Sequence, residues 1–165
     1  MHFKKLLSWI SLGFGSGLSP IGPGTSGSIF ALALYYFLID PLVNDALSVL
    51  MLIISLMCAF LLGIYVYQET VTGEEDPGSF VWDEFVGMWI ACLPITLYIN
   101  LGLLTKSYWW FILAFVLFRI FDIWKPNPIK YFDNRAGGFY VMMDDVAAGF
   151  ISGLIVLMAI LFTIN

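Results

Sequence analysis

Long stretches without a charged side chain constrain this chain more than any other feature. The run from Ala46 to Tyr67 contains no Asp, Glu, Lys or Arg, and it exceeds the ~20 apolar residues that a helix needs to cross a bilayer. Hydrophobic residues fill 61% of the 165 positions, which is more apolar surface than a soluble core of this length can bury. We therefore predict an all-α integral membrane protein, a polytopic helical bundle that forms a single membrane-embedded domain over residues 1–165.

The first uncharged stretch, residues 6–39, is broken by glycine and proline. Ser19-Pro20-Ile21-Gly22-Pro23-Gly24 cannot continue a helix. Residues 3–14 are therefore expected to form an amphipathic or partly inserted helix, with Lys4 and Lys5 at the lipid headgroups.

A second helix is predicted to follow this break, over residues 26–39. It starts near Thr25 or Ser26, because either hydroxyl can cap a helix N-terminus. The segment is short for a crossing, so it is tilted, extended to Val43, or re-entrant. Four later stretches bring the total to about five membrane segments with a Gly/Pro-broken first one: residues 46–67, 82–104, 108–124 and 146–164.

If every segment crosses, the chain alternates and its unusual features meet at one face of the membrane. They are the Gly/Pro loop at 19–25, the acidic loop at 68–79, Asp83-Glu84, the stretch from Arg119 to Lys130, and Asp144-Asp145. A re-entrant second segment would move only the N-terminal arm. Six of the seven basic residues fall on this face, with Lys106 alone opposite. Because cytoplasmic loops carry the excess of Lys and Arg, this face is predicted to be cytoplasmic.

Two pairs of adjacent acids stand at the predicted starts of apolar helices. A single carboxylate at a helix N-terminus needs no ligand, since it satisfies free N–H groups and the helix dipole. Two adjacent carboxylates repel each other, and two such pairs on one face favour a counter-charge over solvated caps. Hard divalent cations bind through carboxylates. We therefore predict a Mg2+ site made by Asp83, Glu84, Asp144 and Asp145.

Arg119, Asp122 and Lys125 recur at three-residue spacing, so they share one face of a helix. One interpretation is an Arg119–Asp122 ion pair that lets both side chains lie near lipid. The interpretation we favour is a phosphate clamp, in which Arg119 and Lys125 bind phosphate oxygens. Asp122 would then be a metal ligand or a base.

The Gly-rich loop over residues 15–25 leads into a helix N-terminus. Exposed N–H groups beside a positive dipole end bind anions, so Gly24 and Thr25 are predicted to contact phosphate. A flexible hinge between two helices is the alternative, and the loop lacks the Gly-Lys-Ser/Thr ending of a Walker A motif. Its predicted position opposite the carboxylates favours phosphate binding.

Several chemistries are excluded by what the sequence lacks. Seven basic residues create no field for nucleic acid, and the single histidine, His2, lies in the N-terminal tail. Carboxylates, a metal and water remain. A divalent-cation transporter or channel is the alternative function, because acid pairs at helix ends also suit it. Against it, the carboxylates gather at one face, and Arg119 and Lys125 would repel a cation.

The Gly-rich loop and the charged motifs occur in a characteristic order along nearly the whole chain. They are Ser16-Gly17-Leu18-Ser19-Pro20 with Pro23-Gly24-Thr25, then Val81-Trp82-Asp83-Glu84, then Phe118-Arg119-Ile120-Phe121-Asp122-Ile123-Trp124-Lys125-Pro126, and finally Gly137-Gly138 followed by Met143-Asp144-Asp145. In this order and spacing the chain resembles the phosphatidylglycerophosphatase A family of bacterial inner membranes.

The resemblance implies a Mg2+-dependent phosphatase that hydrolyses phosphatidylglycerol phosphate to phosphatidylglycerol and inorganic phosphate in phospholipid biosynthesis. It also implies a multi-pass protein of the bacterial inner membrane, with its active site facing the cytoplasm and with the phospholipid substrate and membrane lipids as partners. Asp122 and Glu84 are the predicted catalytic residues. Either water or an aspartate is the nucleophile, and no oligomeric state is predicted.

Overall fold

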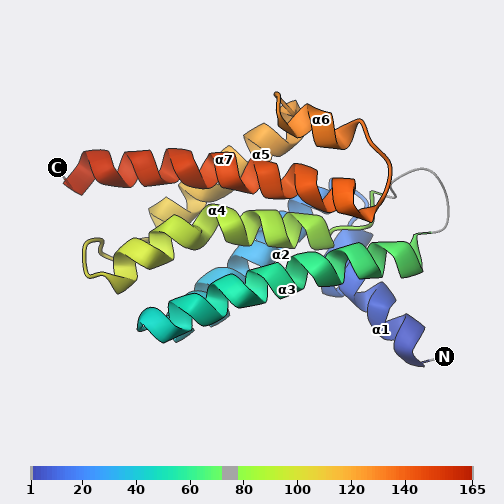
Figure 1. The fold of residues 1–165 in the computed structure, drawn as a ribbon, viewed down its shortest axis with the longest axis horizontal. Helices are drawn as coiled ribbons and strands as arrows, with labels where there is room; N and C mark the ends of the chain where they lie inside the picture. The colour runs from blue at the N-terminus through green and yellow to red at the C-terminus, as the bar shows by residue number, and fades with distance from the viewer. Residues whose placement is uncertain (1, 72–77, 165) are drawn as a thin grey trace.

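A computed structural model describes residues 2–71 and 78–164, and within these ranges the chain is helical and has no strand. The predicted acidic connection therefore falls largely outside the described residues. The elements in Figure 1 are α1 (His2–Ser11), η1 (Gly13–Leu18), α2 (Pro23–Leu34), η2 (Tyr35–Ile39), η3 (Asp40–Leu42), α3 (Ala46–Thr70), α4 (Trp82–Asn100), α5 (Tyr108–Trp124), α6 (Ile129–Asp133) and α7 (Gly138–Ile164).

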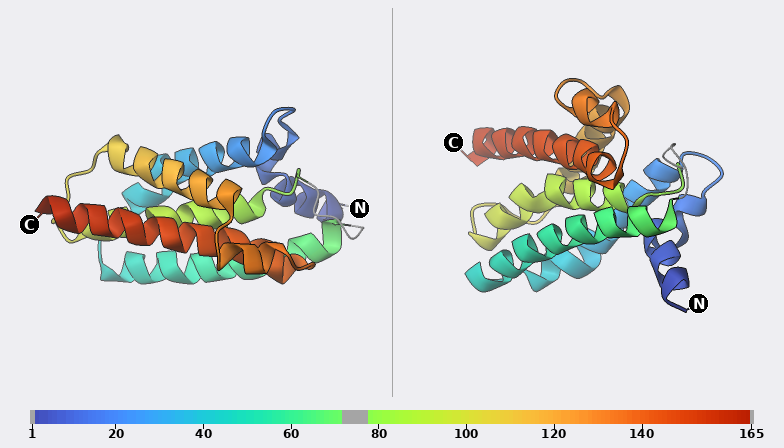
Figure 2. Two further views of the ribbon diagram at one scale, coloured as in Figure 1. Left: turned by 90° about the horizontal axis from the view of Figure 1, so that it is seen from above. Right: turned by 45° about the vertical axis from the view of Figure 1, so that its right-hand side comes forward.

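The long helices α2, α3, α4, α5 and α7 lie side by side, and successive ones run in opposite directions (Figures 1 and 2). Helix α4 lies at the centre and packs most extensively against α7. The starts of α2, α4 and α7 and the end of α5 consequently meet at one end of the bundle. The short connections before α3 and after α4 lie at the other end.

Three helical stretches are long and apolar enough to cross a membrane, judged by length and composition: Pro23–Leu42, Ala46–Thr70 and Gly138–Ile164. The sequence predicted about five. Helices α4 and α5 form close to their predicted ranges, but they are 19 and 17 residues long. These lengths fall below the ~20 residues of a typical crossing, and α4 opens with two acids.

The second helix runs further than residues 26–39. It continues from α2 through η2 and η3 to Leu42, which matches the extended alternative. The predicted cap at Thr25 or Ser26 is wrong, because α2 begins at Pro23 with Gly22 in the left-handed conformation, at φ 59°. Proline is favoured at the first helical position, where its missing N–H costs nothing.

Helix α7 begins at Gly138, eight residues before the predicted start at 146. Asp144 and Asp145 are therefore not at a helix N-terminus, and that part of the prediction is wrong. Both are buried inside the helix, beyond its first turn. The alternative that they cap free N–H groups no longer applies to this pair. Asp83 and Glu84 do lie in the first turn of α4, as predicted.

Glycines let α4 and α7 approach each other closely. A Cβ added to Gly149 would collide with the backbone of Gly87, and one added to Gly87 would lie 2.6 Å from the carbonyl oxygen of Asp145. Small residues at a crossing allow such backbone contact between membrane helices. The contact holds Asp145 against the first turns of α4.

The N-terminal segment closes the same end of the bundle. Helix α1 ends at Ser11, slightly earlier than expected, with Lys4 and Lys5 exposed and Leu7 buried, as an amphipathic helix at the headgroups requires. The carbonyl oxygen of Ser11 accepts a hydrogen bond from the N–H of Val81 at 2.9 Å. This bond ties the segment to the residue that precedes α4.

Candidate active site

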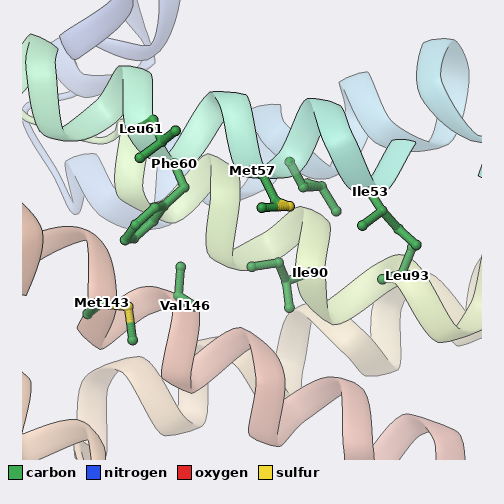
Figure 3. A pocket seen from close by; sticks show the side chains of 9 residues that line it. Ile53, Met57, Phe60, Leu61, Ile90, Leu93, Met143 and Val146 are labelled. Carbon is green, nitrogen blue, oxygen red and sulfur yellow. The ribbon is translucent and has the colours of Figure 1, made fainter. Parts of the chain in front are cut away.

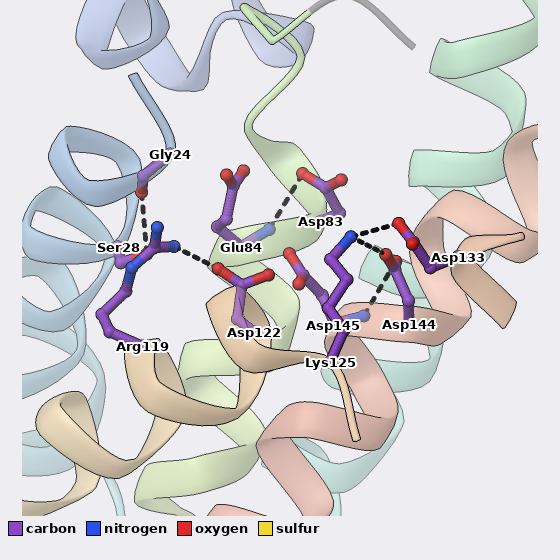
Figure 4. A network of polar contacts seen from close by, with 10 residues as sticks. All are labelled: Gly24, Ser28, Asp83, Glu84, Arg119, Asp122, Lys125, Asp133, Asp144 and Asp145. Carbon is purple, nitrogen blue, oxygen red and sulfur yellow. Dashed lines mark hydrogen bonds and ion pairs between the residues drawn. The ribbon is translucent and has the colours of Figure 1, made fainter. Parts of the chain in front are cut away.

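Three carboxylates converge where α4 meets α7. Asp83, Glu84 and Asp145 each offer an oxygen, and these oxygens lie within 4.8 Å of one another (Figure 4). Asp83 and Asp145 are buried. Three like charges at this spacing repel strongly in a medium of low dielectric constant. A cation bound between them would remove that repulsion.

Glu84 carries the clearest sign of an incomplete site. Its Oε2 atom is buried and has no hydrogen-bond partner among the described residues. A Cβ added to Gly24 would collide with the other oxygen of the same carboxylate, so the start of α2 closes over it. An all-oxygen, carboxylate-rich donor set of this kind fits a hard divalent cation such as Mg2+.

Arg119 lies on the opposite side of Glu84 from Asp83 (Figure 4). Its Nη1 forms an ion pair with Asp122 at 2.5 Å and donates a hydrogen bond to Ser28 Oγ at 3.1 Å. Ser28 in turn donates to the carbonyl oxygen of Gly24 at 2.8 Å. The guanidinium is thereby fixed in place, while its buried Nε–H has no partner among the described residues.

Lys125 ends α5 in the left-handed conformation, at φ 48°. Its Nζ pairs with Asp144 at 2.9 Å and also with Asp133. Burial lowers the pKa of Lys125, but the hydrogen bonds to Asp133 and Asp144 outweigh this, and the pKa lies above its usual value. The ammonium group is therefore charged at any physiological pH.

Most of the residues singled out from the sequence meet at this end of the bundle. Asp122 lies between Arg119 and Asp145 (Figure 4), and it forms with Arg119 the ion pair that was the alternative to a phosphate clamp. The two acids of the second pair point in different directions. Among the described residues, Asp145 joins Asp83 and Glu84 in the cluster of three carboxylates, whereas Asp144 forms an ion pair with Lys125. The side chain of Thr25 lies beside Gly22, in the first turn of α2.

Two partners at the site were not found from the sequence. Ser28 follows Gly24 by four residues and so lies one turn further along the same face, which was a usable signal. Asp133 offers no such signal, because α6 alone brings it back to Lys125. Each fixes one of the two cationic side chains.

Fold and site together define a helical membrane protein. At one end of its bundle, buried carboxylates lie beside two basic side chains, Arg119 and Lys125, that are held by ion pairs. A family model described as phosphatidylglycerophosphatase A matches residues 9–160. The chain belongs to this family and is a phosphatase, a phosphoric monoester hydrolase.

Curated relatives support this assignment. The phosphatidylglycerophosphatase A of Escherichia coli (strain K12) is 41% identical over 146 residues, covering 87% of this chain and 77% of the relative. That of Haemophilus influenzae is 42% identical over 150 residues, covering 89% and 84%. A Bacteroides thetaiotaomicron protein, named provisionally as a phosphatidylinositol-3-phosphatase, is 40% identical over 156 residues, covering 91% of each. No solved structure matches the chain.

Proposed function

We propose that this phosphatase hydrolyses phosphatidylglycerol phosphate to phosphatidylglycerol and inorganic phosphate, in a Mg2+-dependent reaction of phospholipid biosynthesis. The substrate is the one that the names of the Escherichia coli and Haemophilus influenzae relatives carry. The single observation behind the chemistry is the unpartnered Glu84 oxygen within a group of three carboxylates. Such a group suits a metal that binds a phosphate monoester.

Asp83, Glu84 and Asp145 would hold the metal, with Asp144 beside them as a further candidate ligand. Bound Mg2+ would neutralise phosphate charge and make water more acidic. The free Nε–H of Arg119 would donate to a phosphate oxygen, and Lys125 would add its charge. Backbone N–H groups of Gly24 and Thr25, at the positive end of α2, would donate to the same group.

Asp122 and Glu84 are the proposed catalytic carboxylates. Asp122 is already held by Arg119, and it would orient the attacking water or complete the metal shell. Glu84 would take the proton of that water, because its Oε2 atom has no competing partner among the described residues. One turnover in oxygen-18 water distinguishes direct attack, which labels the released phosphate, from an aspartyl-phosphate intermediate attacked at its carboxyl carbon.

The membrane arrangement is part of the same proposal. Helices α2, α3, α4, α5 and α7 would each cross the bacterial inner membrane, with the site facing the cytoplasm. Arg119 and Lys125 lie in the site, Lys130 and Arg135 flank it in sequence, and α1 carries the other two basic residues at that end. Only Lys106 lies at the far end, as the positive-inside rule requires.

Two alternatives give different expectations. A cation transporter is not favoured, because the chain belongs to a phosphatase family and two fixed cations line the site. Phosphatidylinositol 3-phosphate is a second candidate substrate, supported by the Bacteroides thetaiotaomicron relative. Both lipids present a phosphate monoester on a headgroup, so the same site chemistry would serve.

The deciding experiment measures phosphate release from each lipid by the purified protein in mixed micelles. We expect Mg2+-dependent release from phosphatidylglycerol phosphate, faster than from phosphatidylinositol 3-phosphate. Asp83→Asn and Asp145→Asn should remove it, while Asp45→Asn, at an exposed helix cap, should not. Equal activity after chelation, or in the two site variants, would exclude the proposed metal chemistry.

A further inference from the structure

An apolar groove lies between α3 and α7, with α4 as its floor. Its volume is about 410 Å³, within the range of ligand-binding pockets. Figure 3 shows side chains from the three helices pointing into it. The lining residues are Ile53, Leu56, Met57, Phe60, Leu61, Ile90, Leu93, Met143 and Val146. All nine are apolar, so the groove offers shape but no hydrogen-bonding group from a side chain.

The groove and the carboxylate site share two helices, α4 and α7. On α7, Met143 and Val146 immediately flank Asp144 and Asp145. On α4, Ile90 follows Asp83 by seven residues, two helical turns, and so lies on the same face about 10 Å deeper. A molecule whose phosphate reached the carboxylates could therefore extend an apolar tail along this groove.

We propose that the groove holds one acyl chain of the lipid substrate while its phosphorylated headgroup occupies the carboxylate site. This inference rests on the proposed lipid phosphatase activity. The lining matches an acyl chain in chemistry, and two of its residues, Met143 and Val146, flank the Asp144-Asp145 pair on α7. Phe60, Ile53 and Met57 come from a helix that contributes nothing to the carboxylate group, so the groove gives α3 a role in substrate binding.

The bilayer is as apolar as the groove, so burial of the chain there gains little hydrophobic free energy. The groove would instead pack against the acyl chain and fix its position. A chain held between α3 and α7 fixes the depth and direction of its headgroup, so that the phosphate is presented to the site. Groove substitutions should therefore act on KM for the lipid more than on kcat.

Met57→Trp tests this proposal, with Met158→Trp as its matched control. Met57 points into the groove (Figure 3). Met158 lies near the C-terminal end of α7 and does not line the groove. The two side chains are similarly exposed, at 63% and 66%. We expect Met57→Trp, whose larger side chain would fill part of the groove, to raise KM for the diacyl lipid by about fivefold, which corresponds to about 1 kcal/mol. Hydrolysis of the deacylated, water-soluble headgroup phosphate should stay unchanged, and Met158→Trp should affect neither substrate. Equal effects on both substrates, or none, would overturn the proposal.

A second measurement does not depend on turnover. Phosphatidylglycerol with a photoactivatable group on one acyl chain is cross-linked to the wild-type protein, and labelled peptides are identified by mass spectrometry. Label should concentrate on residues 53–61 and near Leu93, and Met57→Trp should reduce it. Even labelling of all lipid-facing helices, or equal labelling by a phosphatidylcholine probe, would show that the groove takes bulk lipid only. If no lipid phosphate is released but groove labelling persists, the proposed activity fails while the acyl-chain site stands.

Discussion

The two ends of the helical bundle both bury aspartate, with opposite outcomes. At the end away from the site, Asp40 is only 6% exposed. It forms an ion pair with Lys106 at 2.7 Å and accepts a hydrogen bond from Thr96 at 2.5 Å. At the site end, three carboxylates share one small volume, and Glu84 Oε2 lacks any partner among the described residues.

The far end is a closed network. Tyr35 donates to Thr96 at 3.1 Å, while Lys106 donates to the carbonyl oxygen of Tyr36 and lies 4.3 Å from the centre of its ring. Each buried polar group there is matched, which is how proteins retain buried charge. The difference indicates that the far end fastens the connections between helices, and it supports the proposal that the site end binds a cation.

Exchanging one aspartate for asparagine at each end should separate these roles and gives the largest expected effect. Asp145→Asn removes one of the three carboxylates of the proposed metal site, and we expect kcat to fall by about 100- to 1,000-fold, since metal catalysis supplies several kcal/mol. Asp40→Asn should change kcat by less than about twofold but lower the free energy of unfolding by about 1–3 kcal/mol. Phosphate release measures kcat, and thermal unfolding measures the stability of each variant. A loss of activity in Asp40→Asn with unchanged stability would refute the assignment of a structural role to the far end and a catalytic role to the site end.

Mg2+ itself should stabilise only a protein with an intact site end. At a concentration 100 times its dissociation constant, a ligand that binds the folded state alone adds about 2.7 kcal/mol. Wild type and Asp40→Asn should both gain thermal stability on addition of Mg2+ after chelation, and Asp145→Asn should gain much less. The comparison needs no substrate. A gain of equal size in all three proteins would place the bound ion elsewhere.

Gly24→Ala should narrow the site without removing any charge. The added Cβ would meet the Glu84 carboxylate and lie 3.6 Å from Arg119 Nη1. We expect kcat/KM to fall by about tenfold, because misplacing a catalytic group by a fraction of an ångström is costly. Gly78→Ala is the control, since among the described residues its Cβ would have only Pro23 Cγ within 4 Å, at 4.0 Å. Steady-state kinetics on both variants would detect the difference, and identical kinetics would contradict the packing of Gly24 against Glu84.

Asp133→Asn should have the smallest effect. It removes one of the two carboxylates that hold Lys125 and leaves Asp144 in place. Because Asp133 is exposed, its ion pair is screened by water and salt, and a loss of about two- to fivefold in kcat/KM is expected. Measurement at low and high salt provides the check, since the wild-type advantage should shrink as ionic strength rises. A loss as large as that of Asp145→Asn would mean that Asp133 takes part in the proposed metal site together with Asp83, Glu84 and Asp145.

Part of this arrangement could be predicted from the sequence. The uncharged apolar run predicted the start of α3 and its end to within three residues, and α5 forms over the predicted residues 108–124. The adjacent acids of α4 marked its start. The start of α7 was missed because Asp144-Asp145 looked like the boundary between loop and membrane. In the structure the helix begins at Gly138, and Asp145 lies inside it with its backbone packed against Gly87.

Side-chain directions were beyond the sequence. The sequence predicted a site made by all four acids, but adjacent residues on a helix point about 100° apart, and the sequence did not show which of the four side chains turn toward the site. The structure sends Asp144 to Lys125 and Asp145 to the carboxylate group. The contact between Asp133 and Lys125 depends on the way the short helix α6 folds back, and such a fold leaves no periodic pattern in the sequence.

The contact between Gly87 and Gly149 has a mechanical consequence. Because backbone meets backbone there, no flexible side chain separates the two helices that carry Asp83 and Asp145. Membranes differ in thickness by several ångströms, and helices respond mainly by tilting. A tilt should carry α4 and α7 together as one rigid pair, so the spacing of the carboxylates is expected to stay the same in thin and thick bilayers.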